Sequence, residues 1–193
     1  MRRTAGLSFY HRKKKINTGI LKEILIWAVE ILLTVAVTVI VVSLFGFRIS
    51  VVGSSMSPTL ANGETILVNR FVYHLFDPKP NDLVVFRPNG NENSHYYIKR
   101  VVAVPGDTVQ IKEGEIYVNG AHIQEEAAAS AVENALSAEE EITIGEDEYF
   151  VIGDNSSNSE DSRYASIGNV KKEYIVGEAW MVAYPWKNLR FIK

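Results

Sequence analysis

Cysteine is absent from this chain of 193 residues, and histidine occurs only four times. The absence of cysteine excludes a disulfide framework, a thiol nucleophile and a cysteine zinc site. The histidines at positions 11, 74, 95 and 122 show no His-x-x-x-His spacing, so we expect no metal site. A basic surface for nucleic acid is also lacking, because the basic residues gather in one short N-terminal segment.

That segment, residues 1–23, contains seven lysines and arginines and one acid, and the apolar run from Ile24 to Phe47 follows it directly. The run is long enough to cross a hydrocarbon core about 30 Å thick as one helix. A cleavable signal peptide is the alternative, but the run exceeds the usual apolar length of about 7 to 15 residues and no Ala-x-Ala site follows. We therefore expect a single-pass anchor at 24–47 in the lipid bilayer of the cell membrane. The positive-inside rule then predicts that residues 1–23 are cytoplasmic and that residues 48–193 form an extracytoplasmic domain.

After the anchor, short runs rich in Val, Ile, Tyr and Phe alternate with turn signals. These runs predict strands at 49–53, 64–73, 82–87, 96–104, 108–112, 115–120, 149–153 and 178–184. Turn signals such as Pro105-Gly106-Asp107 and Asn119-Gly120 favour hairpins over helical crossovers. The predicted fold class is therefore mostly β, with an antiparallel domain behind an N-terminal transmembrane helix.

An acidic insertion is expected at residues 120–147 of that domain. Its central part, Glu125 to Glu141, is rich in Ala, Glu and Leu, which favours a short helix or a mobile acidic loop between strands. A charge-rich segment of this kind is usually a solvated face. The sequence therefore indicates no particular partner for it.

Residues 53–60 read Gly-Ser-Ser-Met-Ser-Pro-Thr-Leu, close behind the predicted membrane exit. A serine-rich turn before proline is commonly a capped turn whose hydroxyls bond to the backbone. In the catalytic alternative one serine is a nucleophile, which needs a base to remove its proton. No histidine is convincingly arranged with a partner acid, so another base is required.

Lys99 is the candidate base, because it lies in a strand dense in aromatic and branched residues. Strand alternation can point its side chain to the same apolar face as Tyr97 and Val101. Desolvation there would lower the pKa of Lys99 and let the neutral amine accept a serine proton. In the alternative interpretation, Lys99 is an ordinary surface charge, as is common for a strand lysine beside an arginine.

A third polar cluster runs from Gly153 to Arg163, after an apolar strand. One interpretation is a loop pinned by an ion pair of Arg163 with Asp161 or with Asp154. In the functional interpretation, a hydroxyl of this loop orients the neutral lysine amine.

These three motifs, in this order, resemble those of the bacterial type I signal peptidases, especially the short single-anchor form of Gram-positive bacteria. The resemblance covers nearly the whole chain. It implies that Ser55 is the nucleophile, that Lys99 is the general base, and that Ser159 is the hydrogen-bond partner of the lysine amine. Asp161 and Arg163 then act as structural supports.

The resemblance also bears on the oxyanion that forms during peptide cleavage. Some relatives place a serine two residues before the nucleophile, where its side chain donates a hydrogen bond to the oxyanion. Gly53 stands at that position here. The oxyanion would rely on backbone groups, the N–H of Ser55 and a second donor that the sequence leaves open.

The function implied by the resemblance is that of a membrane-bound serine endopeptidase that cleaves signal peptides from secretory preproteins after small residues, as in Ala-x-Ala, with no cofactor. No obligate protein partner is implied. Val51, Val52, Met56 and Ile98 flank the catalytic pair and are candidate walls of the substrate pocket, although ordinary core packing explains them equally well.

The main alternative is a membrane-tethered binding or assembly protein that keeps the same fold without turnover. The presence of both Ser55 and Lys99 argues against it. Other serine hydrolases would show Ser-x-x-Lys with companion motifs or Gly-x-Ser-x-Gly, and neither signature occurs.

Overall fold

The computed structural model describes residues 18–45, 47–123 and 136–192. It divides into two compact units, Met1–Ile40 and Val41–Lys193, which we describe separately.

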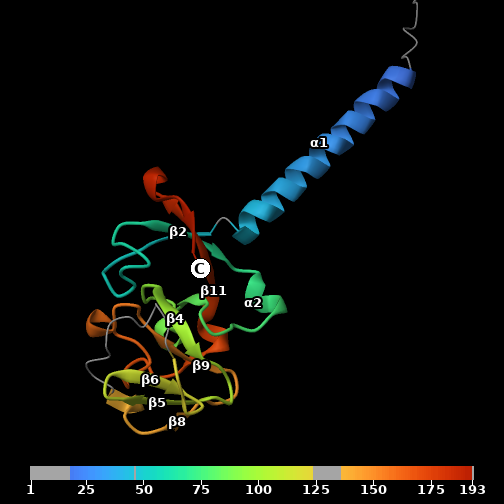
Figure 1. Ribbon diagram of the computed structural model, residues 1–193. Helices are drawn as coiled ribbons and strands as arrows, with labels where there is room; N and C mark the ends of the chain where they lie inside the picture. Colours follow the sequence, from blue (N-terminus) through green and yellow to red (C-terminus); the bar gives the residue numbers. More distant parts are fainter. Residues whose placement is uncertain (1–17, 46, 124–135, 193) are drawn as a thin grey trace, which may run out of the picture. The chain divides into compact units, whose positions relative to one another are not determined.

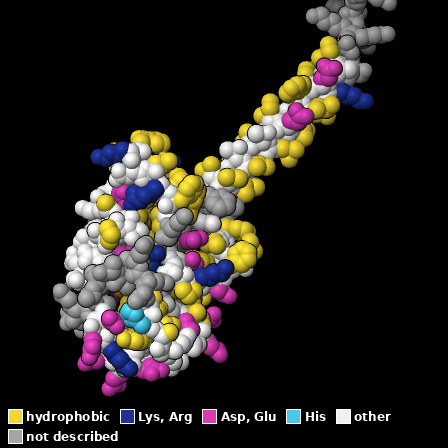
Figure 2. Space-filling view, in the orientation of Figure 1, with side chains coloured by type: hydrophobic (Ala, Val, Ile, Leu, Met, Phe, Trp, Pro, Cys, Tyr) yellow, Lys and Arg dark blue, Asp and Glu magenta, His cyan; other side chains and the backbone are white. Residues whose placement is uncertain are grey.

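The first unit consists of most of helix α1 (Thr18–Phe45). Within it, Gly19–Ser43 has a mean hydropathy of 2.7 and buries none of its surface in the protein; no other helix in the described ranges is long and apolar enough to cross a membrane. Figure 2 shows hydrophobic side chains along the length of this helix. The hydroxyls of Thr34 and Thr38 donate to carbonyl oxygens one turn back, at 2.9 and 2.8 Å. These two hydroxyls are satisfied within the helix and add no unpaired polar group to its apolar surface, on which Glu30 is the one charged residue after Glu23.

The second unit contains two antiparallel sheets, and the predicted mostly β fold class is confirmed. In the larger sheet the strand order is β1-β2-β11-β3-β4-β9-β10, with β12 beside β11. Its strands are β1 (Phe47–Ser50), β2 (Thr65–Asn69), β3 (Leu83–Phe86), β4 (Tyr97–Ala103), β9 (Glu148–Ile152), β10 (Val170–Lys171), β11 (Ile175–Tyr184) and β12 (Arg190–Phe191). The smaller sheet has the order β7-β6-β5-β8, and Figure 1 shows β5, β6 and β8 lying beyond β9 at one end of the domain. Its strands are β5 (Thr108–Lys112), β6 (Glu115–Val118), β7 (Ala121–His122) and β8 (Ile142–Thr143).

After α1, the helical structure in the described part of this unit consists of single turns. They are α2 (Val72–Leu75) and the 3-10 turns η1 (Pro88–Gly90), η3 (Leu136–Ala138), η4 (Ser156–Asn158), η5 (Lys172–Tyr174) and η6 (Trp186–Asn188).

Strand β3 lies between two apolar cores, which explains why its sequence is continuously hydrophobic. All four of its residues are buried. Leu83 and Val85 belong to the core under the segment that carries Ser55, whereas Val84 and Phe86 belong to the core on the other side. A third core covers the smaller sheet and includes Phe150 of β9. The central strands therefore have apolar support on both faces.

The predicted strand 64–73 is wrong in its second half. Strand β2 ends at Asn69, and α2 begins three residues later. The Asn69 side-chain oxygen accepts hydrogen bonds from the N–H groups of Phe71 and Val72, at 3.0 and 3.2 Å. Such an Asn turn gives the backbone an alternative to the sheet ladder. The predicted strand 49–53 likewise stops early, because β1 ends at Ser50.

The predicted insertion 120–147 is described in part, since residues 124–135 of the expected helix or loop lie outside the described residues. Its first strand, β7, pairs with β6, and its last strand, β8, pairs with β5. Ala138 is fully buried in the core of the smaller sheet. Both ends of the insertion are thus part of that sheet.

Glu64 connects the segment that follows β1 with the C-terminal strand. Its buried carboxylate accepts hydrogen bonds from Arg190 at 2.8 and 2.9 Å and from the Asn188 amide at 2.9 Å. Arg190 also donates to the carbonyl oxygen of Thr59 at 2.7 Å. These contacts hold the downstream end of the turn on which Ser55 lies.

We predict that this contact stabilises the domain only above acidic pH. Hydrogen bonds from Arg190 lower the pKa of Glu64 from its ordinary value of 4.5 to about 2. Because the folded-state pKa is the lower one, the stabilisation is complete above about pH 4.5 and is lost as the pH falls toward 2. Glu64→Gln should lower the free energy of unfolding by ~2 kcal/mol near neutral pH, with a smaller effect in acid.

Thermal unfolding followed by near-ultraviolet circular dichroism, in detergent and across this pH range, measures the effect. Glu141→Gln is the control, because Glu141 is exposed. A Glu64→Gln effect of the same size at all pH values would contradict the ion-pair account.

Candidate active site

Ser55 lies in a tight turn whose apolar residues hold it against the core. Met56 and Leu60 are buried, and the N–H of Leu60 donates to the carbonyl oxygen of Met56 at 2.7 Å. The N–H of Ser57 donates to the carbonyl oxygen of Ser54 at 3.1 Å. Among the described residues, nothing forms a hydrogen bond with the Ser55 hydroxyl. The turn is therefore built without that hydroxyl, which leaves it available for chemistry.

Lys99 is a buried lysine and not a surface charge. It lies opposite Val84 in the pairing of β4 with β3, and only 3% of its surface is exposed. Its Nζ lies 5.7 Å from the centre of the Tyr97 ring, so the two side chains share a face of β4, as strand alternation predicted. Burial lowers the pKa of Lys99 to about 8, against the opposing attraction of the Asp161 carboxylate. A substantial fraction of the amine can therefore be neutral at mildly alkaline pH.

The loop from Gly153 to Arg163 is organised around Asp161, which is fully buried. Arg163 donates to both oxygens of this carboxylate, at 2.7 and 2.9 Å. The Ser159 hydroxyl donates to it at 2.6 Å and the N–H of Gly153 at 3.1 Å. One of the two predicted ion pairs, Asp161 with Arg163, is thus formed.

Asp154, at the start of the same loop, forms a bidentate pair with Arg100 at 2.9 Å for both contacts. Arg100 also donates to the carbonyl oxygen of Asn81 at 2.9 Å. The loop is therefore joined to β4 at the residue next to Lys99.

Gly153 is where this loop meets the turn that carries Ser55. A Cβ added to Gly153 would lie 2.5 Å from the carbonyl oxygen of Ser55 and would also collide with the Ser159 side chain. The same carbonyl oxygen accepts the N–H of Asn155 at 3.0 Å. Two more bonds join the segments, from Asn155 Nδ2 to the Ser54 carbonyl oxygen at 3.1 Å and from Asn158 Nδ2 to the Ser54 hydroxyl at 2.6 Å. Close backbone approach therefore requires glycine at position 153.

One pocket of about 450 Å³ brings the predicted catalytic pair together with its predicted walls. Ser55 and Lys99 both line it, and so do all four candidate wall residues, Val51, Val52, Met56 and Ile98. Three of the walls are also members of a buried apolar core, whereas Val52 is 88% exposed. Val51, Met56 and Ile98 therefore both pack in the apolar core and form part of the pocket wall.

Further residues of this pocket had not been identified from the sequence. They are Ile49, Ser50, His95, Tyr96, Tyr97 and Glu160. The sequence could have predicted Tyr97 as a pocket residue, because it lies two residues from Lys99 on the same strand face. No sequence pattern predicts Glu160 as a pocket residue, since only the folded loop brings it there.

The structure does not form the hydrogen bond expected between Lys99 and Ser159. The Ser159 hydroxyl donates a hydrogen bond to the Asp161 carboxylate instead. In the described ranges, no hydrogen bond or ion pair reaches Lys99 Nζ. A hydroxyl that donates to a carboxylate still has acceptor capacity for an amine, and contacts of this kind often tighten only when substrate binds.

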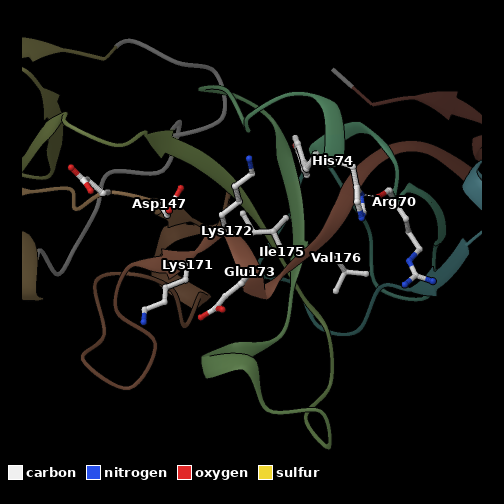
Figure 3. A pocket seen from close by; sticks show the side chains of 10 residues that line it. Arg70, His74, Asp147, Lys171, Lys172, Glu173, Ile175 and Val176 are labelled. Atoms are coloured by element: carbon white, nitrogen blue, oxygen red, sulfur yellow. Dashed lines mark hydrogen bonds between the residues drawn. The ribbon is translucent and has the colours of Figure 1, made fainter.

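A second cavity, of about 650 Å³, lies elsewhere in the domain and holds none of the predicted site residues. Figure 3 shows its mixed lining, in which Arg70, Lys171 and Lys172 occur together with Asp147 and Glu173. It has neither a serine nor a buried lysine, so it lacks the parts of the first pocket.

An antiparallel β domain that places a serine hydroxyl and a buried lysine in one pocket has the parts of a serine hydrolase. A family model described as signal peptidase, peptidase S26, matches residues 24–184. Signal peptidase I P of Bacillus subtilis subsp. natto is 36% identical over 190 residues, covering 94% of this chain and 97% of that protein. Signal peptidase I T of Bacillus subtilis strain 168 is 32% identical over 188 residues, covering 94% of this chain and 93% of that protein. A crystal structure of a signal peptidase I from Enterococcus faecalis V583 is 30% identical and covers 54% of this chain and 97% of its own, with a TM-score of 0.43.

The chain therefore belongs to the signal peptidase family, peptidase S26. It is a hydrolase of the serine endopeptidase class.

We predict that Gly153→Ala reduces activity at least about 100-fold, because the added Cβ must push the loop away from the Ser55 carbonyl oxygen and the Ser159 side chain. Cleavage of a preprotein in detergent measures the loss. Gly106→Ala is the matched control, since Gly106 has a positive φ of 88° but open space around its Cβ position. That variant should lose ~1 kcal/mol of stability and keep its activity. Equal activity of both variants would show that the close approach at Gly153 is unimportant.

Proposed function

We propose that this protein is a membrane-anchored endopeptidase that removes signal peptides from secretory preproteins, with Ser55 as nucleophile and Lys99 as general base. The observation that carries the proposal is the burial of Lys99 in the pocket that Ser55 lines. A lysine there loses the hydration that keeps its amine charged, and a neutral amine can accept a proton from a hydroxyl.

In the proposed reaction, neutral Lys99 takes the proton of the Ser55 hydroxyl while Ser55 Oγ attacks the scissile carbonyl carbon. The tetrahedral intermediate collapses to an ester as Lys99 protonates the leaving amine. The neutral Lys99 amine then removes a proton from water, and the water oxygen attacks the ester carbonyl carbon. As this second intermediate collapses, Lys99 returns the proton to Ser55 Oγ, and the signal peptide leaves with a free carboxyl terminus. The chemistry needs no cofactor.

The loop residues have supporting roles in this scheme. Asp161 and Arg163 hold the loop, and the Ser159 hydroxyl is oriented by Asp161 so that its oxygen can accept a hydrogen bond from the lysine amine. The N–H of Ser55 is the proposed donor to the oxyanion. Gly53 supplies no side-chain donor, and its N–H is directed to Asn62 Oδ1 at 3.1 Å.

The proposed substrates have small residues at the first and third positions before the cut, as in Ala-x-Ala. The proposal is supported by the apolar side chains of Val51, Val52, Met56 and Ile98, which line the pocket beside Ser55 and Lys99 and suit small apolar side chains. No protein partner is required for the reaction.

The proposed topology has residues 1–23 in the cytoplasm and the domain from residue 48 on the opposite side of the membrane. It is supported by the basic residues before the apolar helix. Since signal peptides lie in the same bilayer, the anchor raises their effective concentration at the pocket. Protease added to sealed cells stripped of their wall should digest the domain; full protection of the domain would contradict this orientation.

We predict that Ser55→Ala and Lys99→Met each lower the cleavage rate at least about 1000-fold. The assay uses purified full-length protein in liposomes with a preprotein that carries an Ala-x-Ala site. In the wild type, kcat/KM should rise with pH through about 8, because the base must be neutral and its pKa lies there. Lys171→Met, which removes an exposed lysine of the second cavity, is the control. Full activity of either site variant would refute that residue's role.

We predict that Val51→Gly and Ile98→Gly broaden the side chains accepted before the cut. Each removes part of an apolar pocket wall, so valine or leucine should replace alanine with a smaller loss of kcat/KM than in the wild type. Val182→Gly is the control, because Val182 is buried in the same core but does not line the pocket. Unchanged preferences in both wall variants would show that the specificity is set elsewhere.

A further inference from the structure

Glu160 stands out in the catalytic loop because it is exposed between two buried neighbours, Ser159 and Asp161. Its carboxylate is nevertheless held in place. One oxygen accepts a hydrogen bond from the Tyr97 hydroxyl at 3.3 Å, and the other accepts one from the Ser166 hydroxyl at 3.1 Å. Glu160 also lines the pocket that contains Ser55 and Lys99. It is therefore a positioned charge at the site and not a freely moving surface acid.

Both partners of Glu160 make further contacts of their own. The Tyr97 ring packs against Phe86 with 6.0 Å between ring centres, and the Ser166 carbonyl oxygen accepts the Asn89 amide at 2.9 Å. Burial, and then the charge of Glu160, raises the pKa of Tyr97, so the phenol keeps the proton that it donates. The two hydrogen bonds therefore orient the Glu160 carboxylate in the substrate-free protein.

The two buried arginines near the pocket are bonded to acids other than Glu160. Asp161 is bonded to Arg163, and Asp154 to Arg100. Within the described ranges, Glu160 makes no ion pair. Of the residues that line the pocket, only Lys99, His95 and Glu160 can carry a charge near neutral pH. When Lys99 is neutral, as the proposed mechanism requires, and His95 is neutral too, Glu160 gives the pocket a net negative charge.

We propose that Glu160 is a specificity-determining residue of this peptidase, whose fixed carboxylate favours substrates with a lysine or arginine side chain close to the cut and disfavours those with aspartate or glutamate. The inference rests on the proposed function, because it takes this pocket as the peptide site. A cationic side chain in an extended peptide gains attraction from the carboxylate, and an anionic one is repelled.

The test uses full-length protein in detergent and internally quenched peptides that contain an Ala-x-Ala site. At each position other than the two alanines, from about three residues before the cut to about three after it, the peptide carries lysine, glutamine or glutamate. The measured quantity is the ratio of kcat/KM for lysine to that for glutamate. We expect this ratio to be about fivefold at one position or more at low salt, and smaller at about 1 M salt.

Two variants assign the preference to Glu160. Glu160→Gln keeps the shape of the side chain and should bring the ratio close to one, while Glu160→Lys should invert it. Glu173→Lys is the matched control, because it makes the same charge change in the second cavity and should leave the ratio as in the wild type. The glutamine peptides show in each variant that the enzyme is folded and active.

A wild-type ratio near one at all positions, or a preference that survives in Glu160→Lys, overturns the inference while the cleavage itself stands. If no peptide and no preprotein is cut by the wild type, the proposed function fails and the inference fails with it. A salt-sensitive ratio that inverts in Glu160→Lys, and is unchanged in Glu173→Lys, supports it.

Discussion

The buried carboxylate of Asp161 is the interaction on which the rest of the candidate site depends. A carboxylate with no exposed surface is tolerated only when its lone pairs are satisfied, and here Arg163, the Ser159 hydroxyl and the N–H of Gly153 all bond to it. All of these donors come from the same loop, which therefore closes on itself. Because the loop has this internal support, it can present a fixed surface to the turn that carries Ser55.

The loop contacts the turn that carries Ser55 through backbone groups as well as through side chains. The carbonyl oxygen of Ser55 accepts the N–H of Asn155 and lies so close to Gly153 that no side chain fits between them. On the other side of the turn, Glu64 and Arg190 hold residues 59–64. A nucleophile needs to be held within a fraction of an ångström of its productive position, and here both ends of its turn are fixed by segments distant in sequence.

Lys99 shows how the same arrangement sets the properties of a base. Burial takes the ammonium out of water and lowers its pKa, while the carboxylate of Asp161 opposes that shift and the guanidinium of Arg163 adds to it. Since Asp161 and Arg163 form an ion pair, much of their effect on the lysine cancels, and desolvation dominates. Glu160 forms no ion pair within the described residues, so its negative charge at the pocket is not balanced in this way.

Much of this protein could be predicted from its sequence, because strong local patterns carry the information. They are an apolar run long enough for α1, short runs rich in branched and aromatic residues for β3, β4 and β9, and three motifs in a recognisable order. The end of β2 at Asn69 was missed because a side chain that bonds to the backbone outweighed the apolar pattern, and two-residue strands such as β7 and β10 are too short to show any periodicity. The sequence by itself determined the residue types at the site. Only the tertiary structure decided that Lys99 is buried, that the Ser159 hydroxyl donates to Asp161, and that Glu160 lies at the pocket, because burial and hydrogen bonding between distant segments depend on packing that no local pattern records.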